Sequence, residues 1–134
     1  MATQYSLTSR TNASNQRNTD IGINAVIKLF SGAPPANCGT ADTGTMLVTF
    51  AGNATTFGTI TAQVLTASAV ASVTATATGT PGYFRVYPSA ATGVNAVIQG
   101  TAGTTGTDMI LTAATVTAGQ TTNFTSLTIT PFGI

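Results

Sequence analysis

Residues 21–29 have the sequence IGINAVIKL, in which apolar side chains alternate with small or polar ones. The odd-numbered positions are all apolar, whereas the other parity carries Gly22, Asn24 and Lys28, with Val26 as its one apolar residue. Successive side chains of a β-strand point to opposite faces, so this period of two predicts a half-buried strand.

The rest of the chain repeats this kind of pattern. Turn-forming Gly, Pro and Asn residues recur at intervals of about eight to twelve residues, which is typical of all-β domains. Threonine supplies 30 of the 134 residues, and its branched side chain favours strands over helices. We therefore predict an all-β fold, a single antiparallel β-sandwich of the jelly-roll or immunoglobulin-like kind, over residues 21–134. Its further expected strands are residues 45–51, 59–65, 69–78, 83–87, 94–99, 108–111 and 123–130.

Residues 1–20 differ from this body. They are rich in Thr, Ser, Asn and Gln, and no large apolar residue lies between Leu7 and Ile21. Such a segment cannot bury enough apolar surface to pack alone, which predicts an N-terminal extended arm. The arm either docks on a neighbouring subunit, with Arg10 and Arg17 as contact residues, or is a disordered tail.

The charge composition argues against catalysis. The chain has no His, Glu or Trp, and only seven charged residues. Acid–base, nucleophilic and metal-assisted catalysis need titratable groups placed close together. We therefore expect a protein that is not an enzyme and has no cofactor.

The same composition indicates what the chain binds. A net charge of +1 gives little attraction to nucleic acid, and no apolar run approaches the length of about 18 residues that a membrane span requires. Proteins with so few charges tend to associate, which predicts a homo-oligomer or a subunit of a larger assembly.

Two residue types deserve testing as sites. Asp42 and Asp108 are the loop carboxylates that a calcium ion would need, but neither has a second carboxylate nearby in sequence. We expect no metal site.

Cys38 has no His to activate it, and as the one cysteine it cannot form a disulfide within the chain. Together with a start that lacks the features of a secretion signal, this predicts synthesis in a reducing cytoplasm.

The sequence YFRVY is the most distinctive local feature. Phe84 and Val86 share one face of the expected strand, whereas Tyr83, Arg85 and Tyr87 share the other. Aromatic residues and arginine are enriched at the centres of interfaces, so the second face is a candidate partner contact. The alternative is a core strand on which Arg85 stacks over the tyrosines and provides solubility.

Several segments, in order, resemble a family of small virion proteins that tailed bacteriophages and prophages encode near their capsid genes. The segments are IKLFSG at 27–32, PPA at 34–36, DTGTML at 42–47, FG at 57–58, TGT at 78–80, YFRV at 83–86, QGT at 99–101, GTTGTDMIL at 103–111, TAGQ at 117–120 and LTIT at 127–130.

The resemblance covers residues 25–130 and implies a β-rich structural protein of the head, a decoration or cement protein without catalytic residues. The expected partner is the major capsid protein, and the expected location is the capsid surface. The resemblance also implies a short starting helix, which the Thr, Asn and Ser content of residues 6–20 disfavours. Alternative functions are a tail or head-fibre component, or a carbohydrate-binding, adhesin-like module.

Overall fold

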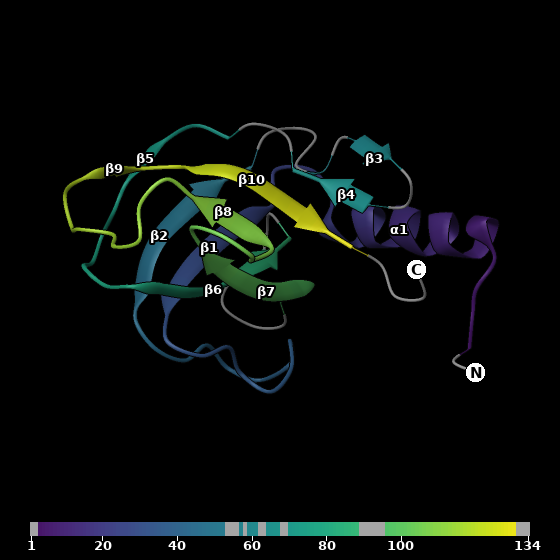
Figure 1. Cartoon of the computed structure of the whole chain (residues 1–134), viewed down its shortest axis with the longest axis horizontal. Coiled ribbons are helices and arrows are strands. Elements are labelled where there is room, and N and C mark those ends of the chain that lie inside the picture. Colours follow the sequence, from purple (N-terminus) through teal and green to yellow (C-terminus); the bar gives the residue numbers. More distant parts are fainter. Residues whose placement is uncertain are drawn as a thin grey trace.

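The computed structural model describes residues 3–52, 57, 59–61, 64–67, 70–88 and 96–130. Within these residues there are one helix and ten strands, and the strands form a β-rich body from which the helix projects (Figure 1). The elements are α1 (Leu7–Ile21), β1 (Val26–Ser31), β2 (Met46–Ala51), β3 (Thr59–Thr61), β4 (Val64–Thr66), β5 (Val73–Thr74), β6 (Pro81–Tyr87), β7 (Ile98–Gly103), β8 (Met109–Leu111), β9 (Thr121–Thr122) and β10 (Phe124–Ile129).

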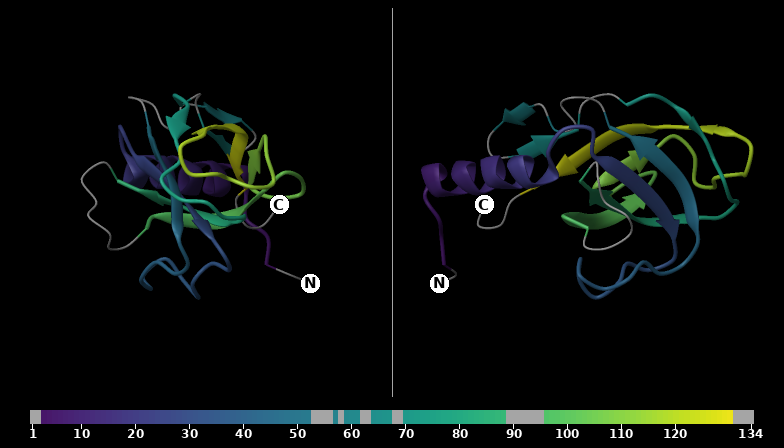
Figure 2. Two further views of the ribbon diagram at one scale, coloured as in Figure 1. Left: turned by 90° about the vertical axis from the view of Figure 1, so that its left-hand side faces the viewer. Right: turned by 180° about the vertical axis from the view of Figure 1, so that it is seen from behind.

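Eight strands form one curled sheet in the order β2-β1-β6-β7-β8-β10-β4-β3, and β5 pairs with β9 in a small second sheet (Figure 2). The β-rich class is therefore confirmed, but the sandwich or jelly-roll arrangement is not. The prediction of a purely antiparallel fold is wrong, because β7 and β8 pair in parallel.

A single carboxylate stabilises this parallel junction. The Asp108 Oδ2 atom accepts hydrogen bonds from the Thr101 backbone N–H at 2.9 Å and from the Thr101 hydroxyl at 3.0 Å. These bonds join the start of β8 to the middle of β7. Asp108 thus acts as a local turn cap, a common role of aspartate in loops.

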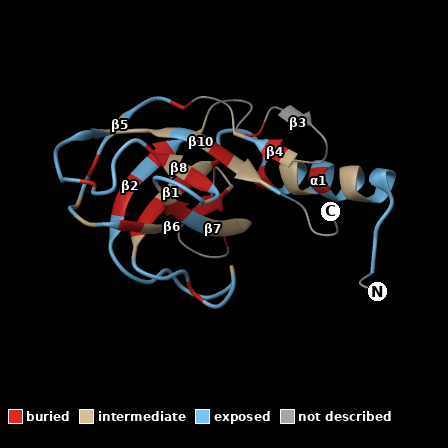
Figure 3. Ribbon diagram, in the orientation of Figure 1, coloured by how far each residue is buried: buried red, intermediate tan, exposed pale blue. Residues whose placement is uncertain are grey.

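The core lies on the concave side of the curled sheet (Figure 3). Ile27 and Leu29 of β1 and Phe84 and Val86 of β6 are fully buried there, as the alternating patterns predicted. The Phe50 and Phe124 rings add an edge-to-face contact with centroids 5.2 Å apart. Further buried members are Leu47, Val48, Phe57, Leu65, Met109, Leu111 and Leu127.

The prediction of an extended arm is wrong, because residues 7–21 form α1. The Ser6 hydroxyl caps its start by accepting a hydrogen bond from the Ser9 N–H at 3.1 Å. Gly22, with a φ of 71°, ends it and donates its N–H to the Asn18 carbonyl. Ile21 is therefore the last helical residue rather than the first strand residue.

Candidate functional site

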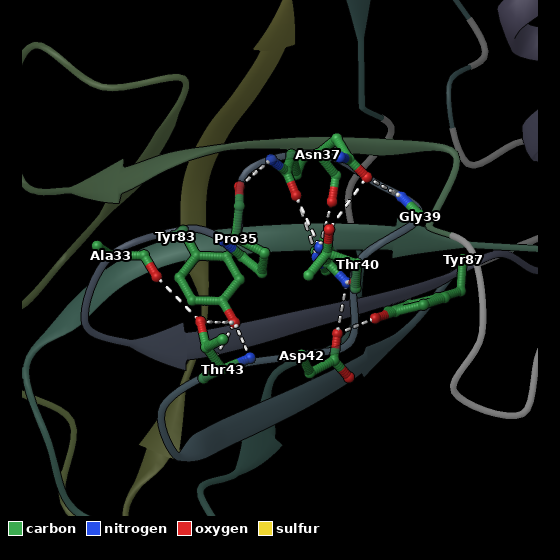
Figure 4. A network of polar contacts seen from close by, with 11 residues as sticks. Ala33, Pro35, Asn37, Gly39, Thr40, Asp42, Thr43, Tyr83 and Tyr87 are labelled. Carbon is green, nitrogen blue, oxygen red and sulfur yellow. Dashed lines mark hydrogen bonds and ion pairs between the residues drawn. The ribbon is translucent and has the colours of Figure 1, made fainter.

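The structure covers the predicted contact face of β6 with a loop. Tyr83, Arg85 and Tyr87 have exposed fractions of 0%, 1% and 0%. The covering segment is residues 32–45, which connect β1 to β2 and are called the strap below (Figure 4). The prediction of an exposed aromatic and arginine patch is therefore wrong, since these side chains face the underside of the strap.

Arg85 binds the strap through its guanidinium group. Its Nη1 atom donates to the Thr40 carbonyl at 2.7 Å and to Asp42 Oδ1 at 2.9 Å. Its Nη2 atom donates to the Asn37 carbonyl at 2.9 Å. The Gln99 side-chain oxygen accepts from Arg85 Nε and Nη2 at 3.2 and 2.9 Å. A buried cation with this many partners fixes the loop that supplies them.

The two tyrosines hold the second half of the strap. The Tyr83 hydroxyl donates to the Thr43 carbonyl at 2.6 Å and accepts from the Thr43 N–H at 3.0 Å. Its ring stacks on Phe30 with centroids 4.9 Å apart. The Tyr87 hydroxyl donates a hydrogen bond to Asp42 Oδ1. The Asp42 Oδ1 atom is thus shared between Arg85 and Tyr87.

The Tyr87 environment predicts a loss of stability at alkaline pH. Burial, reinforced by the hydrogen bond to Asp42, raises the pKa of Tyr87 from 10.0 to about 12. Between these values the unfolded chain releases a proton that the folded chain retains, so the stabilisation present below pH 10 is lost towards pH 12. We expect a decrease of about 2–3 kcal/mol in the free energy of unfolding.

Urea titrations at about pH 9, 10 and 11.5 measure this loss, and the Tyr87→Phe variant should show a smaller decrease than the wild type. The exposed Tyr5 provides the control, because Tyr5→Phe should reproduce the wild-type decrease. Equal slopes for the wild type and Tyr87→Phe would contradict the assignment.

The outer side of the strap is a preorganised and almost uncharged surface. Its backbone is bonded from beneath, and its one charged residue, Asp42, pairs inward with Arg85. Compact loops of this length that are fixed by their own contacts frequently carry binding functions. The exposed residues of the strap include Ala33, Pro34, Ala36, Asn37, Gly39, Thr40 and Ala41.

The predicted arm residues Arg10 and Arg17 lie on one side of α1, with Ser14 and Ile21. Their spacing of four, three and four residues places all of them on the face that turns towards the body. Ser14 and Ile21 are buried, whereas Arg10 and Arg17 are half-buried. Contact of the two arginines with a partner stays a prediction.

A cleft of about 410 Å³ lies where α1, the strap and the sheet meet. Arg17 and Asp20 line it from α1, and Cys38 lines it from the strap. The Arg17 Nη1 atom is buried and has no hydrogen-bond partner among the described residues. The remaining lining residues are Val97, Ile98, Gln99, Gly100, Asp108, Ile129 and Thr130.

The chain matches no known protein-family model, no curated protein and no solved structure. Within the described ranges, no three metal-ligating side chains lie together. α1, the one helix of the described residues, is also too short and too polar to cross a membrane. The strap and the arm, with the cleft between them, are thus the candidate sites.

Sequence patterns identified the loop but not its role. The expected strands at residues 21–29 and 45–51 implied a connection between them, and the structure has the strap there. Nothing in the pattern indicated that Arg85, more than 40 residues away, would bind it. The signal that was available is the chemistry of Arg85 itself, because a strand arginine flanked by apolar residues needs local acceptors.

Proposed function

We propose that this chain is a structural virion protein that decorates a bacteriophage capsid and stabilises it by bridging major capsid subunits. The resemblance of residues 25–130 to small virion proteins motivates the proposal. The structural observation that carries it is the projecting helix α1, whose outer side is exposed along its length (Figure 3).

α1 is poorly suited to remain exposed. Its 15 residues are at the lower limit for a helix to be stable alone, and they are mostly Thr, Ser and Asn, which are weak helix formers. Tyr5 and Leu7, at or just before its start, are large hydrophobic residues that are exposed. A polar helix that leaves its supporting body is typical of a segment that bridges to a neighbouring unit.

The surface of the body fits the same role. Arg85 is buried and paired with Asp42, whose side chain is 27% exposed, which leaves five charged residues outside this pair in the whole chain. Little repulsion therefore separates adjacent copies on a shell. Repetition of modest contacts by capsid symmetry would then give large collective resistance to internal pressure.

The burial of the tyrosines weighs against the carbohydrate-binding alternative. Sugar sites usually present exposed aromatic rings, whereas Tyr83 and Tyr87 lie under the strap. Among the aromatic residues that the structure describes, only Tyr5 is exposed. The tail or head-fibre alternative differs from decoration mainly in copy number.

The copy number in purified particles of the encoding phage tests the proposal. Quantitative mass spectrometry against the major capsid protein should give hundreds of copies, on the order expected for a symmetric shell. About a dozen copies or fewer would place the chain at the portal, tail or fibre, and absence from particles would refute a virion role.

A further inference from the structure

We propose that the tip of the arm, Tyr5 and Leu7, inserts into the cleft between α1, the strap and β7 of a second copy of this chain. The inference rests on the proposed assembly role and names the partner of the arm. It assigns one occupant to two surfaces that the structure leaves uncovered.

The tip is the first of these surfaces. Leu7 is 60% exposed and Tyr5 is 54% exposed. Leu7, Ser14 and Ile21 are seven residues apart and so lie along one side of α1. That side is buried at Ser14 and Ile21, but α1 runs past the body before it reaches Leu7 (Figure 1). Leu7 therefore extends a packing face beyond the surface that would cover it.

The cleft is the second surface, and its chemistry matches the tip. Its volume of about 410 Å³ lies in the usual range for sites that enclose a small organic group, about 300–1,000 Å³. Half-buried Val97, Ile98 and Ile129 provide apolar walls for a leucine. Arg17 Nη1 supplies a buried donor that lacks a partner among the described residues, and the hydroxyl of a tyrosine can accept from it.

The tip cannot fill the cleft of its own chain. Leu7 and Arg17 are ten residues apart on one continuous helix, which separates them by about 15 Å along the axis. A second copy is free of this restriction. An antiparallel arrangement of two α1 helices, centred near Asn12, brings each tip beside the Arg17 of the other chain. Such an exchange is reciprocal, as twofold interfaces require.

Sedimentation velocity of the full chain in reducing buffer, from about 1 to 200 μM, tests the exchange. The tip variant is Leu7→Asp, which places a carboxylate in the first helical turn where the helix tolerates it. The cleft variant is Thr130→Arg, because Thr130 is exposed and lines the cleft. The matched controls are Thr8→Asp, which adds the same charge on another side of α1, and Thr117→Arg, on a loop outside the cleft.

We expect the wild type and both controls to associate, and each of the two test variants to weaken association at least about tenfold. An equimolar mixture of Leu7→Asp and Thr130→Arg should associate more tightly than either variant alone and less tightly than the wild type, since the mixed dimer keeps one of the two tip–cleft contacts. Circular dichroism and thermal unfolding of each variant verify that it is folded. A second readout is the alkylation rate of Cys38. This rate should decrease as the concentration of the wild type increases, because the thiol lines the cleft that the tip of the second copy would fill.

Three results would overturn the inference: a wild type that stays monomeric, controls as weak as the test variants, or a mixture that associates no more tightly than either variant alone. The proposed function is tested separately, by adding Leu7→Asp to particles that lack this protein. A monomeric variant that still occupies particles would leave the decoration role intact, whereas an associating wild type that never binds particles would refute only that role.

Discussion

Replacing Arg85 with alanine is expected to lower the free energy of unfolding by about 3–5 kcal/mol, the usual loss when one partner of a buried ion pair is removed. Arg85 is 1% exposed, and its guanidinium group is the donor for Asp42 and for two strap carbonyls. The alanine variant leaves these acceptors without their donor and opens a cavity under the strap. The Asp42 side chain is 27% exposed, so water can solvate its carboxylate in part, which favours the lower end of the range.

Urea unfolding followed by circular dichroism measures the loss. The matched control is Lys28→Ala on the adjacent strand β1, where the ammonium group lies 4.8 Å from the centre of the Tyr87 ring. A single cation–π contact of a half-buried lysine is worth about 0.5–1 kcal/mol, so the control should be only mildly affected. A loss below about 1 kcal/mol for Arg85→Ala would show that the strap does not depend on the guanidinium.

The Arg85→Lys variant separates charge from geometry. Lysine keeps the positive charge, but its single ammonium group cannot donate to Asn37, Thr40 and Gln99 in the directions that the planar guanidinium provides. We expect the free energy of unfolding of Arg85→Lys to lie between that of the wild type and that of the alanine variant. Hydrogen exchange of the strap amides should increase in both variants, because their opening no longer breaks the full network.

The strands were predictable where one face of the sheet packs on the core. Alternation correctly predicted that Ile27 and Leu29 of β1 and Phe84 and Val86 of β6 are buried, because successive side chains of a strand point to opposite faces. The strand predicted at residues 21–29 begins too early, however, since β1 spans Val26–Ser31, Ile21 ends α1, and Ile23 is 64% exposed. β7 was predicted at residues 94–99 but occupies Ile98–Gly103, and residues 94–95 lie outside the described residues. The glycines of β7 made this strand hard to predict, because glycine is uncommon in strands, yet Gly100 is needed there for packing. A Cβ at Gly100 would lie 2.8 Å from the Phe84 ring.

α1 was missed because propensity and capping disagree. The Thr, Asn and Ser content opposes a helix, whereas Ser6 and Gly22 satisfy its ends and Ile21 anchors it to the body. Summed propensities are a weak guide when specific caps and one buried anchor act together. The spacing of Leu7, Ser14 and Ile21 was the available signal for the helix.

The role of the YFRVY strand was missed for a different reason. Alternation shows which side chains share a face but not what covers that face. The cover is the strap, whose acceptors lie 43 to 48 residues from Arg85 in the sequence. Such a long-range pairing has no period and no spacing rule, so only the folded structure reveals it.

Breaking α1 is expected to remove particle binding while leaving the β-body folded. Ala13 lies in the middle of the helix and is exposed, so a substitution there does not disturb the core. A proline in a helix interior removes one hydrogen bond and clashes with the preceding turn, at a cost of about 3 kcal/mol or more. α1 is marginal by composition and should not withstand this. Ala13→Pro should lose the helical circular dichroism signal and keep the cooperative unfolding of the body.

Occupancy on particles that lack the protein should then fall at least about tenfold, because an unfolded arm must be ordered again on docking. Deleting residues 1–20 should have the same effect, since Ile21, the apolar anchor of the helix, stays in the chain. Ala13→Ser is the matched control, as serine at an exposed helical position costs only about 0.5 kcal/mol. Unchanged occupancy for Ala13→Pro would show that the arm is only a tail. The outer side of the strap would then be the contact surface, because Tyr83, Arg85 and Tyr87 beneath it cannot reach a partner.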